Sequence, residues 1–127
     1  MLLDLEQYKR QCKKETEQYV WRIQTDLYSK IKEVASENKV YPSVVMRYII
    51  NWSCDKMESD EQFREHMLEI TLGKNDSEGK KKYMYTISKN VNDKLLETNK
   101  KYRLNNINFF VVESARLFFE TFETYEQ

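Results

Sequence analysis

The hydrophobic and polar positions of this chain run through the same order twice. Residues 19–24 and 83–88 each place a large apolar side chain at every second position, which predicts a short strand with one buried face. The buried positions keep a constant offset of 64 residues: Tyr19 and Tyr83, Trp21 and Tyr85, Ile23 and Ile87. Two segments with apolar residues at helical spacing follow each strand. We therefore predict two repeats of strand, helix, turn and helix.

Cap residues and the single proline locate the predicted helices. Asp26 is predicted to cap the first helix of the first repeat, and the proline ends that helix so that Ser43 caps the next. This next helix is apolar on most sides and is expected at the centre of the core. In the second repeat the helices are predicted at about 92–102 and 108–124, with Asn108 capping the last one. Because Asn108 follows Ser43 by 65 residues, the second turn is expected to hold one extra residue.

The remaining segments divide the chain into four parts. Ser59, followed by Gln62, has the pattern of a capping box and is predicted to open a connecting helix. The only two glycines then mark a flexible linker. The predicted parts are an N-terminal basic arm or helix (1–17), the first repeat (18–57), the connecting helix and linker (58–80) and the second repeat (81–124).

Composition favours a helix-rich protein in which the two repeats share one core. Of the 127 residues, 33% are charged and 40% hydrophobic, with two glycines and one proline. A repeat of roughly 40 residues is near the lower limit for independent folding, so each copy needs a partner. The expected fold is mainly α with a short two-stranded antiparallel β-ribbon, whose inner face is covered by the four helices. The chain lacks a membrane-length apolar run and a signal peptide pattern, so we expect a cytoplasmic protein without a membrane partner.

Enzyme chemistry and cofactor binding are not expected. His66 is the only histidine and is interpreted as a surface residue rather than a general base. Cys12 and Cys54 lack metal-type spacing and are expected to be unpaired thiols. No metal site, phosphate loop or cofactor motif is recognised. The phenylalanines of the last helix are interpreted as core rather than as a stacking platform for bases: Phe109, Phe110, Phe118, Phe119 and Phe122.

Charge is balanced overall but unevenly placed. There are 21 basic and 21 acidic residues, and basic clusters precede both predicted strands. One cluster includes Lys9 and Lys13, and the other is Lys80, Lys81 and Lys82. Such clusters are either solvated surface or a source of attraction for a phosphate backbone.

Two stretches resemble the ribbon-helix-helix family of DNA-binding proteins, which includes the Arc and methionine repressors. Residues 22–38 look like the strand end and first helix of an Arc-type repressor, and residues 106–116 resemble the capped second helix. The resemblance covers about two thirds of the chain. It implies tandem ribbon-helix-helix repeats that form an intramolecular pseudo-dimer, with pairing between chains left open. Two copies in one chain also look like the accessory proteins of conjugative-plasmid relaxosomes.

The resemblance implies that the ribbon enters the DNA major groove. Arg22 would then contact a guanine and Gln18 an adenine, while Lys82 and Thr86 read the second half-site. The base-contacting set is Gln18, Val20, Arg22, Lys82, Met84 and Thr86. The phosphate-contacting set is Ser43, Val44, Asn108, Phe109, Lys80 and Lys81. The implied partner is double-stranded DNA with an asymmetric pseudo-palindromic site, with self-association along the DNA as a further expectation.

Three roles are compatible with these features. The first is a small transcriptional repressor, and the second is a relaxosome or partition accessory factor of a plasmid or phage. The third is a protein-interaction module that has lost DNA binding, because Val20 and Met84 place apolar side chains on the outward face of the ribbon. The sequence also departs from the family at Lys39 and Arg103, which stand where glycine is usual in the turn between the helices.

Overall fold

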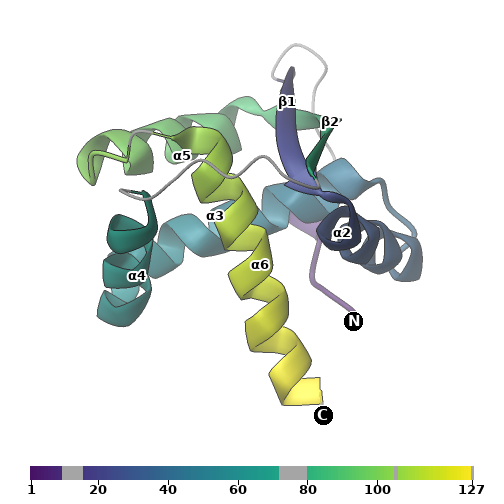
Figure 1. The fold of residues 1–127 in the computed structure, drawn as a ribbon. Helices are drawn as coiled ribbons and strands as arrows, with labels where there is room; N and C mark the ends of the chain where they lie inside the picture. The colour runs from purple at the N-terminus through teal and green to yellow at the C-terminus, as the bar shows by residue number, and fades with distance from the viewer. Residues whose placement is uncertain (10–15, 72–79, 105, 127) are drawn as a thin grey trace.

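The chain folds into six helices and an antiparallel pair of strands in the described residues of a computed structural model (Figure 1). Described are residues 1–9, 16–71, 80–104 and 106–126, with backbone but not side chains at 16–18, 71, 80, 81, 84 and 124–126. The elements are α1 (Glu6–Lys9), β1 (Thr16–Gln24), α2 (Thr25–Glu37), α3 (Pro42–Ser59), α4 (Glu61–Thr71), β2 (Lys80–Ser88), α5 (Lys89–Lys101) and α6 (Ile107–Glu126). The predicted mainly helical fold with a small antiparallel sheet is confirmed.

The pairing of β1 with β2 separates an inner and an outer face of the sheet, as the alternation predicts. The inner side chains of Trp21, Ile23, Tyr85 and Ile87 are buried. Tyr19 and Tyr83 are half-buried and pack against the core. The prediction that the sheet contains only two strands is not confirmed. Within the described residues, the strands of the sheet are β1 and β2.

Helix α3 is the centre of the core, as its apolar composition predicts. Its side chains at Val45, Met46, Ile49 and Ile50 are fully buried. The helix contacts α2, α4, α5, α6 and β2, and α6 crosses over it (Figure 1). Of the phenylalanines predicted to be core, Phe110, Phe118 and Phe119 are buried, and Phe122 is half-buried and packed against the core; Phe109 is half-buried.

The predicted helix caps are wrong at each of the four helices. Gln24 is the N-cap of α2, and Tyr41 precedes α3, whose first residue is the proline. Asp60, rather than Ser59, receives a hydrogen bond from the Phe63 N–H at the start of α4. Asn106, rather than Asn108, receives one from the Phe109 N–H at the start of α6, at 3.0 Å. The caps Tyr41 and Asn106 are still 65 residues apart, so the predicted extra residue in the second turn is confirmed.

The turns that follow α2 and α5 have the same geometry although neither contains glycine. Lys39 has φ 57° and Arg103 has φ 56°, both in the left-handed region. The Val40 N–H donates to the Ala35 carbonyl at 2.9 Å, and the Leu104 N–H donates to the Asn99 carbonyl at 2.8 Å. Both turns therefore close their helix with the hydrogen-bond pattern that usually employs glycine.

Glycine at either turn is expected to stabilise the protein. A non-glycine residue in the left-handed conformation costs roughly 1–2 kcal/mol, and glycine offsets part of that gain by its greater freedom in the unfolded chain. Lys39→Gly and Arg103→Gly should therefore each raise the free energy of unfolding by about 0.5–1 kcal/mol, measured by urea denaturation. Lys100→Gly, inside α5, is the matched control and should lower it by about 1 kcal/mol.

The N-terminal arm and the connecting helix both pack onto the core. Within residues 1–9 the arm is helical at α1, which packs on α3, and the Leu5 and Tyr8 side chains are buried. Residues 10–15 of the predicted arm or helix (1–17) lie outside the described residues, and residues 16 and 17 belong to β1. On the other side, α4 packs on α6, where the half-exposed His66 contacts the buried carboxylate of Glu113 (Nε2 to Oε1, 3.0 Å).

Candidate nucleic-acid interface

The outer face of the sheet carries three cross-strand pairs formed by the six predicted base-contacting residues. The pairs are Gln18 with Thr86, Val20 with Met84 and Arg22 with Lys82. Arg22 and Lys82 are exposed, Val20 is 53% exposed and Thr86 is half-buried. The side chains of Gln18 and Met84 lie outside the described residues. The register therefore brings all six residue positions onto one face.

The outer edge of β1 is held by α6. The Asn108 side chain accepts a hydrogen bond from the Arg22 N–H at 2.7 Å and donates one to the Arg22 carbonyl at 2.9 Å. Both backbone groups of Arg22 therefore point away from β2. Asn108 thus serves the strand rather than the cap of its own helix, which explains why its predicted capping role is wrong.

The outer edge of β2 is held in the same way by α3. The Ser43 hydroxyl accepts a hydrogen bond from the Thr86 N–H at 2.9 Å, and the Arg47 guanidinium donates to the Thr86 carbonyl at 2.8 Å. Thr86 follows Arg22 by 64 residues, and Ser43 precedes Asn108 by 65. Equivalent positions of the two predicted repeats thus make the same kind of contact, each between one strand and the second helix of the other repeat.

These edge contacts fix the spacing of the outward side chains. In an antiparallel pair, residues whose backbone groups point outward form a non-hydrogen-bonded pair, with Cα atoms about 4.5 Å apart and side chains close together. The backbone N–H and C=O groups of Arg22 and of Thr86 point to a helix and not to the other strand. Val20 lies two residues before Arg22, so its backbone groups point the same way as those of Arg22. All three outward pairs are consequently of the close kind.

Arg47 is a buried anchor for the sheet that the sequence did not predict. Its side chain is 5% exposed and also donates to the Tyr8 carbonyl at 2.6 Å, so it joins the N-terminal arm to β2. Burial lowers the pKa of the Arg47 guanidinium. Its one sequence signal is a basic residue within the apolar stretch from Val44 to Ile50.

Four of the six predicted phosphate-contacting positions lie at the starts of α3 and α6, and the other two, Lys80 and Lys81, lie at the start of β2. Ser43, Asn108 and Phe109 are half-buried, and Val44 is buried. Two of the backbone amides at these helix starts already have hydrogen-bond partners within the protein: the Val44 N–H donates to the Tyr41 carbonyl at 3.0 Å, and the Phe109 N–H donates to Asn106. The positive ends of both helix dipoles remain beside the sheet edges. The side chains of Lys80 and Lys81 lie outside the described residues.

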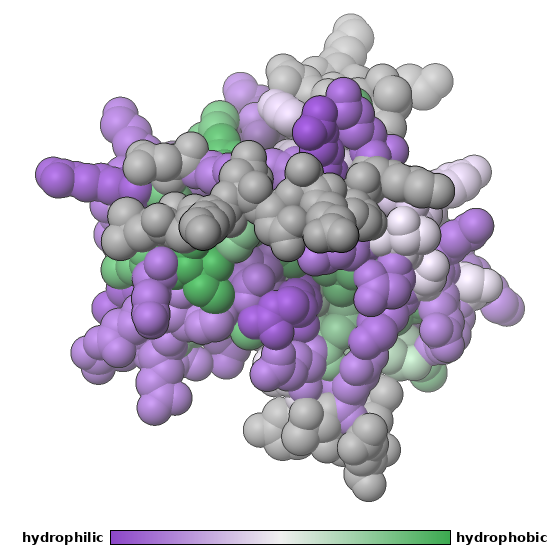
Figure 2. All heavy atoms as spheres, viewed as in Figure 1, coloured by the Kyte–Doolittle hydropathy of each residue, from purple (hydrophilic) through white to green (hydrophobic). Residues whose placement is uncertain are grey.

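Neither cation of the outer face takes part in an ion pair in the part of the chain that the structure describes. The ion pairs there are made by the N-terminus, by His66 and by other lysines and arginines, and none includes Arg22 or Lys82. The described surface seen in Figure 2 is mainly hydrophilic, with hydrophobic residues (green) visible between hydrophilic ones (purple). The outer face therefore keeps its positive charge available for an anionic partner.

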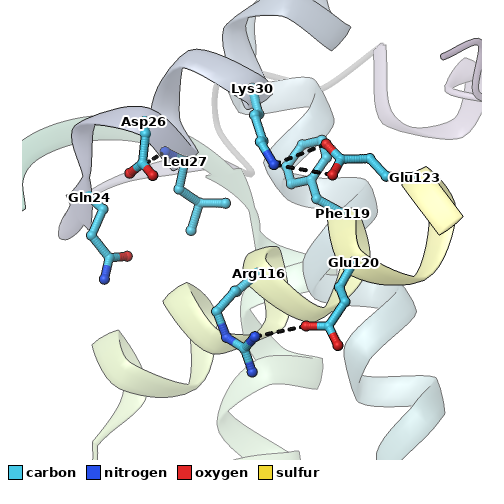
Figure 3. Close-up of a pocket in the computed structure, with 8 residues that line it drawn as sticks. All are labelled: Gln24, Asp26, Leu27, Lys30, Arg116, Phe119, Glu120 and Glu123. Atoms are coloured by element: carbon cyan, nitrogen blue, oxygen red, sulfur yellow. Dashed lines mark hydrogen bonds and ion pairs between the residues drawn. The ribbon is translucent and has the colours of Figure 1, made fainter.

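A pocket of about 370 Å³ between α2 and α6 is the main alternative site (Figure 3). Both of its cations are paired with acidic residues: Lys30 with Glu123 at 3.0 Å, and Arg116 with Glu120 at 2.8 Å. The pocket is lined by Gln24, Asp26, Leu27, Lys30, Arg116, Phe119, Glu120 and Glu123. Since these cations are already paired, the pocket does not present a ready anion site.

Other candidate chemistry is weak in the described residues. Cys54 is a free, buried thiol, and burial raises its pKa to about 11, so it stays protonated at neutral pH. Cys12 lies outside the described residues. Within the described ranges no cluster of three or more metal-ligating residues occurs. None of the helices there combines the length and the apolar character that a membrane crossing requires.

Comparison with known proteins does not assign the chain to a family. No family model matches it, and searches of curated proteins and of solved structures find no match.

Proposed function

We propose that this protein binds double-stranded DNA sequence-specifically by inserting the β1–β2 ribbon into the major groove. The observation that carries the proposal is the exposed outer face, on which Arg22 and Lys82 form a cationic cross-strand pair without a recorded acidic partner. A major groove accepts a two-stranded ribbon, and arginine or lysine donates to guanine O6 and N7. The resemblance of residues 22–38 and 106–116 to ribbon-helix-helix proteins agrees with this mode of binding.

We also propose that the two repeats act as an intramolecular pseudo-dimer. The support is a set of contacts that recur at equivalent positions. The left-handed turns at Lys39 and Arg103 are one example, and the contacts of Asn108 with Arg22 and of Ser43 with Thr86 are another. Such a unit presents two helix N-termini, one on each side of the ribbon, to the phosphates that flank the groove.

A small transcriptional repressor is the role we favour, and a relaxosome or partition accessory factor would use the same DNA-binding surface. A protein-interaction module is the second candidate, favoured by the 53% exposure of Val20 at the centre of the outer face. A DNA binder would place this side chain against a thymine methyl group. An interaction module would instead bury it in a protein partner.

Selection of bound duplexes from a random DNA library at near-physiological salt tests the proposal. The expected result is enrichment of one motif by the wild-type protein and loss of selectivity at one or more positions with Arg22→Ala. Failure to enrich any motif, at low salt as well, would overturn DNA recognition and favour the interaction module.

A further inference from the structure

We infer that the recognised DNA site is polarised, with guanine contacts concentrated in one half and adenine or thymine contacts in the other. This inference rests on the proposed function and deepens it. It concerns which outward residues act together. The six outward positions lie on two strands. Each half of the DNA site could therefore be contacted by the residues of one strand, or by the residues of both strands at one end of the ribbon.

The strand register divides them end by end. Arg22 lies opposite Lys82 at one end of the outer face, and Gln18 lies opposite Thr86 at the other. Val20 lies opposite Met84 at the midpoint between them. One end of the ribbon therefore carries both long cations, and the other carries an amide and a hydroxyl residue. The sequence-based assignment, which gave Lys82 and Thr86 to the same half-site, is revised by this register.

The chemistry of the two ends selects different bases. Arginine and lysine donate to the two acceptors of guanine in the major groove, whereas glutamine pairs with adenine and threonine accommodates either a base edge or a thymine methyl group. The apolar midpoint suits a thymine methyl group. A strand rises about 3.4 Å per residue and DNA about 3.4 Å per base pair, so the two ends are about four base pairs apart.

At the cationic end, repulsion between Arg22 and Lys82 destabilises the free protein, and DNA binding would relieve that repulsion. Like charges directly opposite on a strand pair destabilise it, most of all in close, non-hydrogen-bonded pairs. The Asn108 contacts place Arg22 and Lys82 in such a pair. No acidic side chain is recorded in an ion pair with either residue in the described ranges. A site that holds two unneutralised cations together is suited to an electronegative ligand, and guanine N7 and O6 beside the phosphate backbone provide one.

The test is the DNA selection repeated with Arg22→Ala, Lys82→Ala and Thr86→Ala. Arg22→Ala and Lys82→Ala are expected to relax positions in the same half of the motif, and Thr86→Ala should relax the opposite half. Each of the first two should lower affinity for the wild-type motif about 5- to 150-fold. Lys100→Ala removes one exposed charge at the far end of α5 and is the matched control, which should leave the motif unchanged. Circular dichroism confirms that each variant is folded.

The possible results distinguish a failure of the proposed polarity from a failure of the proposed DNA binding. A motif in which Arg22→Ala and Lys82→Ala relax opposite halves, or a symmetric motif, overturns the polarity and leaves DNA binding in place. Absence of any enriched motif with the wild-type protein overturns the proposed function, and the polarity with it.

Discussion

Replacing Phe118 with alanine is expected to lower the free energy of unfolding by about 3–5 kcal/mol. Phe118 is fully buried in α6 and lies among four aromatic rings. Its ring centroid is 5.4 Å from that of Trp52, and the other neighbours are Tyr48, Phe119 and Phe122. Truncation removes contacts between α3 and α6 and leaves a cavity at the centre of the core. Such a loss is a large part of the roughly 5–15 kcal/mol that stabilises a typical domain.

Urea denaturation followed by circular dichroism measures this effect. Leu96→Ala is the control, because Leu96 is 45% exposed and its truncation should cost less than about 0.5 kcal/mol. If Phe118→Ala cost less than about 1 kcal/mol, the packing of α6 on α3 described above would be wrong.

Arg22→Ala is expected to weaken binding to the selected DNA by about 1–3 kcal/mol, with little change in stability. The side chain is exposed, and the contacts of Arg22 with Asn108 are made by its backbone, so they persist in the variant. Removal of one of two neighbouring cations also relieves repulsion within the free protein. Fluorescence anisotropy with labelled duplex gives the affinity, and denaturation gives the stability.

Lys100→Ala controls for the loss of one positive charge and should change the affinity far less. A loss in the Arg22→Ala variant no greater than that of Lys100→Ala would mean that Arg22 contributes only general electrostatic attraction.

The faces of the strands could be predicted because alternation is a local signal. Trp21 and Ile23 are buried and Arg22 is exposed, as a period of two residues requires. The apolar centre at α3 followed from composition alone. Lys39 and Arg103 stand where turns of the ribbon-helix-helix family usually have glycine. The sequence therefore showed that a positive φ there would be unfavourable, but not that both residues adopt one.

The caps could not be predicted, because tertiary contacts compete for the same side chains. Ser43 and Asn108 are good capping residues, yet both bind strand edges that are 43 and 86 residues away in sequence. Which outward residues lie opposite one another was equally hidden, since the register depends on how two distant strands meet. The basic Arg47 within an apolar stretch signals a buried polar contact, but nothing local identifies the Tyr8 carbonyl of the N-terminal arm as its partner.

Methylation protection of the selected duplex tests most directly whether the ribbon reads the major groove. Dimethyl sulfate reacts with guanine N7, the atom that an arginine on the ribbon would cover. The expected result is a guanine protected by the wild-type protein and by Lys100→Ala, and reactive again with Arg22→Ala at a concentration that saturates the DNA. Equal protection by wild-type and Arg22→Ala, or none by either while the DNA is bound, would contradict recognition through this face.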